Sequence, residues 1–123
     1  MLTYKQSTGE LFVGNDRLPL IQGYSGADKY KNDPLSQAVH NKGPIPQGEW
    51  GIVGPPVDTA THGPNVLHLY PKPGTETYGR SGFLIHGDSI AHPGEASEGC
   101  IVLPSSVRIY IWKAGDLDLR VVA

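Results

Sequence analysis

The chain has 123 residues and a mass of 13.2 kDa, the size of one domain with a modest core and one site. Sixteen glycines and eleven prolines are too many for a helical bundle and indicate a turn-rich β fold. The net charge of -2, without any cluster of lysine or arginine, removes the electrostatic basis for binding nucleic acid. No window is apolar enough for a membrane span, so we expect no membrane insertion.

The N-terminal third alternates strand-like segments with polar connectors. Leu2–Tyr4 and Glu10–Val13 flank the connector QSTG, which predicts a hairpin. Arg17–Gln22 resumes the apolar pattern and predicts a further strand. Gly23–Asn41 has mixed polarity and no clean period, so we expect a long connection with one short helix at Pro34–His40.

From Gly43 onward, short apolar runs are separated by glycine and proline. The runs at 66–69 and 83–85 read as buried strands, and Leu117–Val122 predicts a final strand. Together these segments predict a mainly β fold, a compact sandwich or barrel-like domain over residues 1–123 with one or two short helices.

The segment PSSVRIYIWKAG fits both the strand period and the helix period. Ser105 or Ser106 can cap the first turn, Lys113 suits the last turn, and Gly115 can follow the last turn. These end signals predict a short helix here.

The only cysteine, Cys100, follows Ser97-Glu98-Gly99 and precedes the apolar run Ile101–Leu103. This pattern predicts a turn that lifts the thiol to a sheet edge. Gly99 would let a substrate approach the backbone, and the amides of Gly99 and Cys100 could bind a developing oxyanion. A single cysteine also excludes an internal disulfide, so the thiol is free. From the residue alone, an inert buried cysteine remains the alternative.

His86 is the best candidate for a base that accepts the thiol proton. It ends the apolar run Phe83–Ile85 and is followed by Gly87, so its ring should lie at a strand terminus that faces a loop. A strand-end histidine without a catalytic role is the alternative. We expect His92, which precedes a proline, to line the mouth of a cleft. The remaining histidines, expected in loops or on strand surfaces, are His40, His62 and His68.

The segment from His86-Gly87 to Cys100-Ile101 resembles the HG…S-x-G-C-[IV] signature of the YkuD-type L,D-transpeptidase catalytic domain, with fourteen positions from His to Cys. Residues 45–52, IPQGEWGI, resemble the upstream TPxGxFxI strand of that family. The wider pattern, over residues 24–103, is similar to type VI secretion effectors that attack peptidoglycan with an L,D-transpeptidase-like domain. Its further elements are Tyr24-Ser25-Gly26, residues 41–48, His62-Gly63-Pro64 and Gly79-Arg80.

The resemblance implies a thioester mechanism. His86 takes the thiol proton of Cys100, and the thiolate attacks the third residue of a peptidoglycan stem tetrapeptide and expels the terminal D-alanine. Water as acceptor gives L,D-carboxypeptidase activity, a D-amino acid gives exchange, and a stem amine gives a cross-link. In the family the carbonyl of the next residue, here Gly87, orients the base. Asp88 could substitute for it or could be a solvated turn residue.

One position departs from the family pattern. Family members carry an arginine two positions after the cysteine, where this chain has Val102. Arg80 and Arg108 are the candidates for its role, and the sequence does not choose between them. Without this arginine we expect hydrolysis or exchange to exceed cross-linking.

The predicted site therefore has two parts. The predicted catalytic residues are Cys100, His86, Gly87, Ser97 and Gly99, with Ser97 expected to hydrogen-bond within the cysteine loop. The predicted substrate-binding residues are Tyr24, Asn41, Trp50, Arg80, Asp88 and His92.

Three alternatives use the same residues. Papain-like and NlpC-type peptidases place the cysteine first, at a helix N-terminus, whereas here His86 precedes Cys100. A degenerate module that binds peptidoglycan or a partner would not need both residues. A metal site made of Cys100, His86 and His92 has too few soft ligands and no paired spacing, so no metal and no cofactor is expected.

Met1–Asn15 has no apolar export segment. We therefore expect a chain made in the cytoplasm without a Sec signal and delivered by a contact-dependent machine to the periplasm of target bacteria. The expected partners are peptidoglycan stem peptides, a cognate immunity protein and a component of the secretion apparatus.

Overall fold

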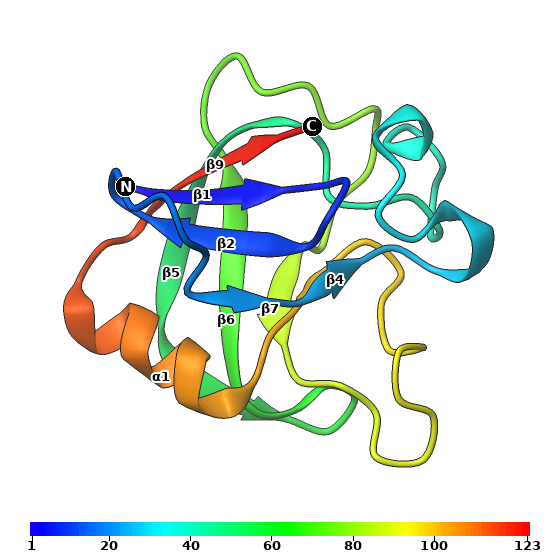
Figure 1. Cartoon of the computed structure of the whole chain (residues 1–123). Coiled ribbons are helices and arrows are strands. Elements are labelled where there is room, and N and C mark those ends of the chain that lie inside the picture. The colour runs from blue at the N-terminus through cyan, green and yellow to red at the C-terminus, as the bar shows by residue number, and fades with distance from the viewer.

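The computed structural model describes residues 1–123, and its framework is one nine-stranded sheet (Figure 1). This arrangement confirms the mainly β prediction. The strands are β1 (Leu2–Lys5), β2 (Glu10–Val13), β3 (Ile21–Gln22), β4 (Tyr24–Ser25), β5 (Gly48–Thr59), β6 (Gly63–Pro71), β7 (Leu84–His86), β8 (Ile101–Val102) and β9 (Asp118–Val122). The helices are the short 3₁₀ turns η1 (Asp28–Tyr30) and η2 (Pro34–Ser36) and the α-helix α1 (Ser105–Ala114).

The sheet curls until its two edges nearly meet. The strand order is β3-β2-β1-β9-β5-β6-β7-β8-β4, and the edge strands β3 and β4 are separated along the chain by Gly23 alone. A Cβ atom at Gly23 would lie 2.1 Å from the carbonyl oxygen of Val102, so a side chain does not fit there. The amide of Gly23 donates to the carbonyl of Gly9 at 2.7 Å. The sheet is therefore barrel-like, as predicted.

The N-terminal hairpin and the final strand form as predicted, and β1 and β9 lie side by side in parallel. Two other predictions need correction. The expected strand Arg17–Gln22 is a strand only at β3. The expected helix at Pro34–His40 is reduced to η2, and the carbonyl of Gln37, which follows it, accepts a hydrogen bond from Arg80.

The helix α1 packs against β5, β6 and β7. Its Ile111 is buried, and Gly115 ends it in the left-handed region with φ 73°. The predicted serine cap is wrong, because Pro104 holds the N-cap position and no side chain caps the helix. The hydroxyl of Ser105 accepts instead from the side-chain amide of Asn65. No helix in the structure has the length and apolar character that a membrane crossing needs.

The core lies between the inner face of the sheet and α1. Trp50 is fully buried there, its indole N–H donates to the carbonyl of Pro46 at 3.0 Å, and its ring and that of Phe83 pack in a T-shaped arrangement. The expectation that Trp50 forms part of a substrate wall is therefore wrong. The cluster comprises Leu2, Tyr4, Leu11, Ile45, Trp50, Ile52, Leu67, Leu69, Phe83, Ile85, Ile101, Leu103, Ile111, Leu119 and Val121.

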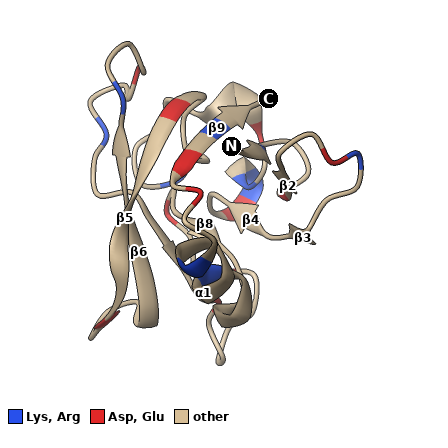
Figure 2. Cartoon of the chain, turned by 90° about the vertical axis from the view of Figure 1, so that its left-hand side faces the viewer, with Lys and Arg blue, Asp and Glu red and all other residues tan.

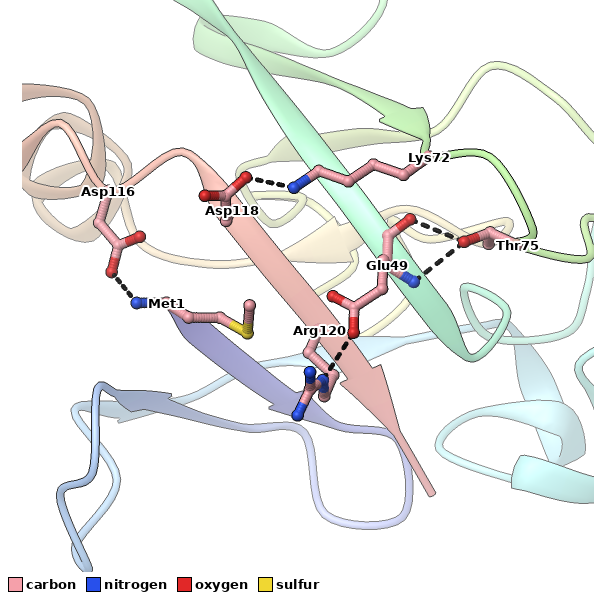
Figure 3. Close-up of polar contacts among 7 residues, drawn as sticks. All are labelled: Met1, Glu49, Lys72, Thr75, Asp116, Asp118 and Arg120. Atoms are coloured by element: carbon pink, nitrogen blue, oxygen red, sulfur yellow. Dashed lines mark hydrogen bonds and ion pairs between the residues drawn. The ribbon is translucent and has the colours of Figure 1, made fainter.

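Charged residues are dispersed over the chain, and acidic and basic positions alternate near β9 (Figure 2). The segment around β9 carries three exposed ion pairs, which we call the β9 charge ladder (Figure 3). Its members are Met1 with Asp116, Lys72 with Asp118, and Arg120 with Glu49.

Candidate active site

The topology brings His86 and Cys100 to one place. Strands β7 and β8 are parallel neighbours, with Ile85 opposite Ile101 and His86 opposite Val102. His86 ends β7, and Cys100 directly precedes β8. The connection between them can therefore leave the sheet and return while both side chains line one pocket.

This pocket has a volume of about 510 Å³, within the range of small-molecule sites. Only a few apolar side chains line it, so the pocket suits a polar ligand. Beside His86, Cys100 and Arg80, its polar wall includes His40, Asn41, Thr61, His62, Glu95 and Glu98.

His86 is 2% exposed, and its Nδ1 lies 2.8 Å from the carbonyl oxygen of Gly87. A carbonyl can only accept, so Nδ1 carries the proton and Nε2 is left as the acceptor. Burial lowers the pKa of His86, the Gly87 carbonyl opposes that effect, and the neighbouring His62 and Arg108 lower it further. His86 is therefore a neutral imidazole near pH 7, the form that accepts a proton.

Cys100 is half-buried, and its Sγ lies 3.8 Å from the carbonyl oxygen of Gly82. Burial raises the pKa of the thiol to about 11, the backbone N–H of Leu84 and the charge of Arg80 lower it, and Glu98 raises it. No hydrogen bond joins Cys100 to His86. The resting pair is therefore a neutral thiol and a neutral imidazole.

The turn before Cys100 is held by Ser97. Its hydroxyl donates to the carbonyl of Cys100 at 2.7 Å and accepts from the amides of Gly26 at 2.9 Å and Gly99 at 3.1 Å. Gly99 has φ 135°, and a Cβ there would lie 2.3 Å from a guanidinium nitrogen of Arg80. We expected the amides of Gly99 and Cys100 to bind an oxyanion. The Gly99 amide donates to Ser97, so of these two only the Cys100 amide has no hydrogen-bond partner.

Arg80 lines the pocket, whereas Arg108 does not. The Arg80 guanidinium is buried and donates to the carbonyls of Gln37, Gly43 and Pro44. No carboxylate pairs with it. Most of its N–H groups are thus occupied by the backbone, which leaves few of them for the substrate-binding role that we expected.

Tyr24 and Asp88 lie outside the pocket wall, contrary to expectation. The Tyr24 hydroxyl donates to the Asp88 carboxylate at 2.6 Å and accepts from the Ala96 amide at 2.8 Å. Asp88 also accepts from the Gly94 amide at 3.0 Å. Partial burial would raise the pKa of Asp88, but these hydrogen bonds hold it below its usual value. Tyr24 and Asp88 therefore fasten the connection between His86 and Cys100.

Of the two remaining residues that we expected to bind substrate, one lines the pocket and the other does not. Asn41 lines the pocket. His92 does not: it is exposed, and its Nδ1 lies 3.6 Å from the Glu95 carboxylate. The mouth of the pocket is therefore built without His92.

Sequence reasoning missed two pocket histidines. His62, in the turn between β5 and β6, lies with its ring centroid 4.8 Å from that of His86. His40 also lines the pocket, with Nε2 2.8 Å from the carbonyl oxygen of Tyr78. The His62-Gly63-Pro64 motif was the available signal, but its distance from His86 along the chain gave no reason to pair the two.

The structure is thus a small barrel-like β domain in which a single cysteine and a buried neutral histidine line one polar pocket. Residues 20–119 match the family model of the Tlde1 domain, so the chain belongs to the Tlde1 domain family, a family of type VI secretion effectors. No curated protein and no solved structure matches the chain.

Proposed function

We propose that this protein is a peptidoglycan-modifying cysteine enzyme of the L,D-transpeptidase type, which cleaves the L,D bond of stem tetrapeptides through a thioester on Cys100. The observation that carries the proposal is the shared pocket of Cys100 and His86, in which the Gly87 carbonyl fixes the base. The resemblance to YkuD-type domains supplies the substrate class, and the effector family fits an antibacterial role.

The first half of the reaction transfers the acyl group to the protein. Nε2 of His86 accepts the Cys100 proton as Sγ attacks the carbonyl of the third stem residue. The free amide of Cys100 can donate to the developing oxyanion. The tetrahedral intermediate collapses, the bond to D-alanine breaks, and the leaving amine takes the proton from His86. The products are a thioester and free D-alanine.

The second half depends on the acceptor. His86 removes a proton from water or from the amine of a D-amino acid, and that nucleophile displaces Sγ, which recovers its proton. Arg80 is engaged by backbone carbonyls, and Val102 supplies no charge, so the pocket offers little to hold a second stem. We therefore propose that hydrolysis or exchange exceeds cross-linking.

The test is mass spectrometry of muropeptides after incubation with purified protein, with and without an added D-amino acid. We expect loss of D-alanine from tetrapeptides, exchange when the D-amino acid is present, and few cross-linked dimers. His68→Ala is a matched control for His86→Ala, because His68 is exposed on β6. Unchanged tetrapeptides would contradict the proposed reaction, and dimers as the main product would contradict the proposed acceptor.

The proposed site of action is the periplasm of target bacteria, with a cognate immunity protein that protects the producer. Expression in a Gram-negative host distinguishes action on the cell wall from action on a cytoplasmic target. We expect a form fused to an export signal to inhibit growth and a cytoplasmic form to be harmless. Equal inhibition by both forms would contradict action on the cell wall.

A second candidate is a binding module without turnover. The protonated Cys100 and the missing hydrogen bond to His86 favour it. The two functions differ in their response to stem peptides. An enzyme releases D-alanine repeatedly, whereas a module binds tetrapeptides and leaves them intact.

A further inference from the structure

Two buried arginines flank the site, and each lies against a glycine of the His-Gly or Gly-Cys motif. Arg80 lies against Gly99. Arg108 lies against Gly87, where an added Cβ would be 3.0 Å from its Nη1. Arg108 is 2% exposed, does not line the pocket of His86 and Cys100, and has no carboxylate partner. A buried cation without a counter-ion is costly unless hydrogen bonds compensate it, so its contacts indicate its role.

All three nitrogens of the Arg108 guanidinium are bonded to backbone carbonyls. Nε donates to Asn65 at 2.9 Å and Nη2 donates to Pro64 at 3.0 Å, both at the start of β6. Nη1 donates to the carbonyl of Leu103, which directly follows β8. One side chain from α1 thus joins the strand after Cys100 to the strand after His62.

These contacts converge on His86. The amide of Leu103, whose carbonyl Arg108 holds, donates to the carbonyl of His86 at 3.0 Å. His62, whose ring packs against His86, directly precedes the β6 strand held by Arg108 at Pro64. The same guanidinium therefore bonds to two backbone segments beside His86: the one whose Leu103 amide donates to the His86 carbonyl, and the one that follows His62.

Gly87 completes the arrangement. Its carbonyl accepts from Nδ1 of His86, and a glycine without a neighbour would be free to rotate that peptide. The guanidinium of Arg108 lies where a side chain at Gly87 would begin, so rotation of this peptide would meet it.

We propose that Arg108 is a positioning residue of the site: it clamps the backbone around Gly87 and thereby holds His86 in the tautomer with the proton on Nδ1. The relevance to catalysis rests on the proposed function, whereas the tautomer itself does not. Arg108 would then act on the base, and Arg80 on the cysteine turn.

The charge environment of His86 is consistent with this role. Burial lowers the pKa of His86, and the charges of His62 in the β5–β6 turn and Arg108 in α1 lower it further. The Gly87 carbonyl and Asp88 after β7 act in the opposite direction. Removing Arg108 should therefore raise the pKa of His86 as well as loosen its tautomer.

The experiment is a long-range ¹H–¹⁵N correlation spectrum of the histidine rings, recorded without substrate at several pH values. In the natural chain we expect His86 as the Nδ1–H tautomer. In Arg108→Met we expect a mixture with the Nε2–H tautomer and a raised His86 pKa, with a partial effect in Arg108→Lys. Arg120→Met, on the exposed face of β9, is the matched control and should leave the His86 signals unchanged.

A kinetic arm uses the same variants. Arg108→Met should lower kcat by about 10–100-fold with little change in KM, the size expected for a residue that orients another. If Arg108→Met does not fold, Gly87→Ala tests the same contact from the other side, because its Cβ would lie 3.0 Å from Nη1 and would push the guanidinium away from Gly87. Gly87→Ala combined with Arg108→Lys should recover part of the Nδ1–H signal.

An Nε2–H tautomer in the natural chain, or an unchanged Nδ1–H tautomer in a folded Arg108→Met or Gly87→Ala variant, would overturn the positioning role. The proposed function fails separately, if stem peptides are not cleaved while the tautomer responds as expected. The two results therefore cannot be confused.

Discussion

Charged side chains have opposite surroundings in two regions of the molecule: the β9 charge ladder, and the part of the sheet around His86 and Cys100, which we call the pocket end. On the ladder, each cation meets a carboxylate in solvent, as Arg120 meets Glu49 at 2.7 Å. At the pocket end, Arg80 and Arg108 are buried, have no carboxylate partner and donate their hydrogen bonds to backbone carbonyls, and Arg80 also lies over the Phe83 ring. Exposed pairs contribute little to stability because water screens them, whereas buried groups with fixed partners are expensive to disturb.

This difference indicates where substitutions should be tolerated and where they should not. Backbone carbonyls that bond to a buried arginine lose their partners together when the arginine is removed. They belong to segments far apart in the chain, such as Leu103 and Pro64 for Arg108. The pocket end should therefore respond strongly to single substitutions, and the β9 charge ladder should respond weakly.

The largest effect on turnover should come from Cys100→Ala. Without Sγ no thioester can form, so D-alanine release should fall to background while the fold stays intact, because the half-buried thiol contributes little packing. Muropeptide mass spectrometry and thermal unfolding check the two halves. Release of D-alanine by Cys100→Ala would contradict a mechanism with a cysteine nucleophile.

His86→Ala should be the next largest, with acylation slower by about 10²–10⁴-fold, the usual effect of a positioned general base. The measurement is the rate of D-alanine release, with His68→Ala as the exposed control. A larger loss of activity in His62→Ala than in His86→Ala would show that His62, and not His86, is the base.

Arg80→Met compares the two regions directly through the free energy of unfolding. Three close hydrogen bonds to backbone carbonyls and a longer fourth one, to Glu98 at 3.5 Å, are lost, so we expect a loss of about 2–4 kcal/mol. Arg120→Met should change it by no more than about 0.5 kcal/mol, because its pair with Glu49 is exposed. Urea denaturation measures both, and equal losses would break the contrast.

Tyr24→Phe should have a smaller effect that is confined to the connection between His86 and Cys100. It removes two hydrogen bonds, to Asp88 and from Ala96, for a loss of about 1–2 kcal/mol. Hydrogen exchange at the Ala96 amide should accelerate, whereas Tyr110→Phe on the exposed side of α1 should leave it unchanged. Unchanged exchange would show that this contact does not fasten the connection.

The smallest intervention is a change of pH without mutation. Burial raises the pKa of Cys100 to about 11, so the thiolate fraction should grow about tenfold per pH unit up to that value. Alkylation by iodoacetamide should therefore be slow at pH 7 and rise steadily between pH 7 and 10. A plateau reached below pH 7 would instead indicate a preformed thiolate–imidazolium pair.

Much of the framework could be predicted because it depends on local pattern. The QSTG connector between two apolar alternations predicted the first hairpin, and Gly115 predicted the helix end. The motif spacing predicted that His86 and Cys100 share a site. Those signals lie within short stretches of sequence, where periodicity and glycine placement are informative.

What could not be predicted depends on partners without a side-chain signature. Arg80 and Arg108 bond to carbonyls, which every residue carries, so neither their burial nor their roles could be deduced from the sequence. His62 meets His86 only because β6 and β7 pair. Trp50 was misplaced because an aromatic residue in a strand fits both a pocket wall and a core.

The central claim is that Cys100 carries the acyl group of a stem peptide. The most direct test is the intact mass of the protein mixed rapidly with a purified stem tetrapeptide and quenched in acid, followed by peptide mapping. The account expects a mass increase equal to the stem without its D-alanine, located on Cys100 and absent from Cys100→Ala. Release of D-alanine with no adduct on Cys100 in any quenched sample, or with an adduct on another residue, would contradict it.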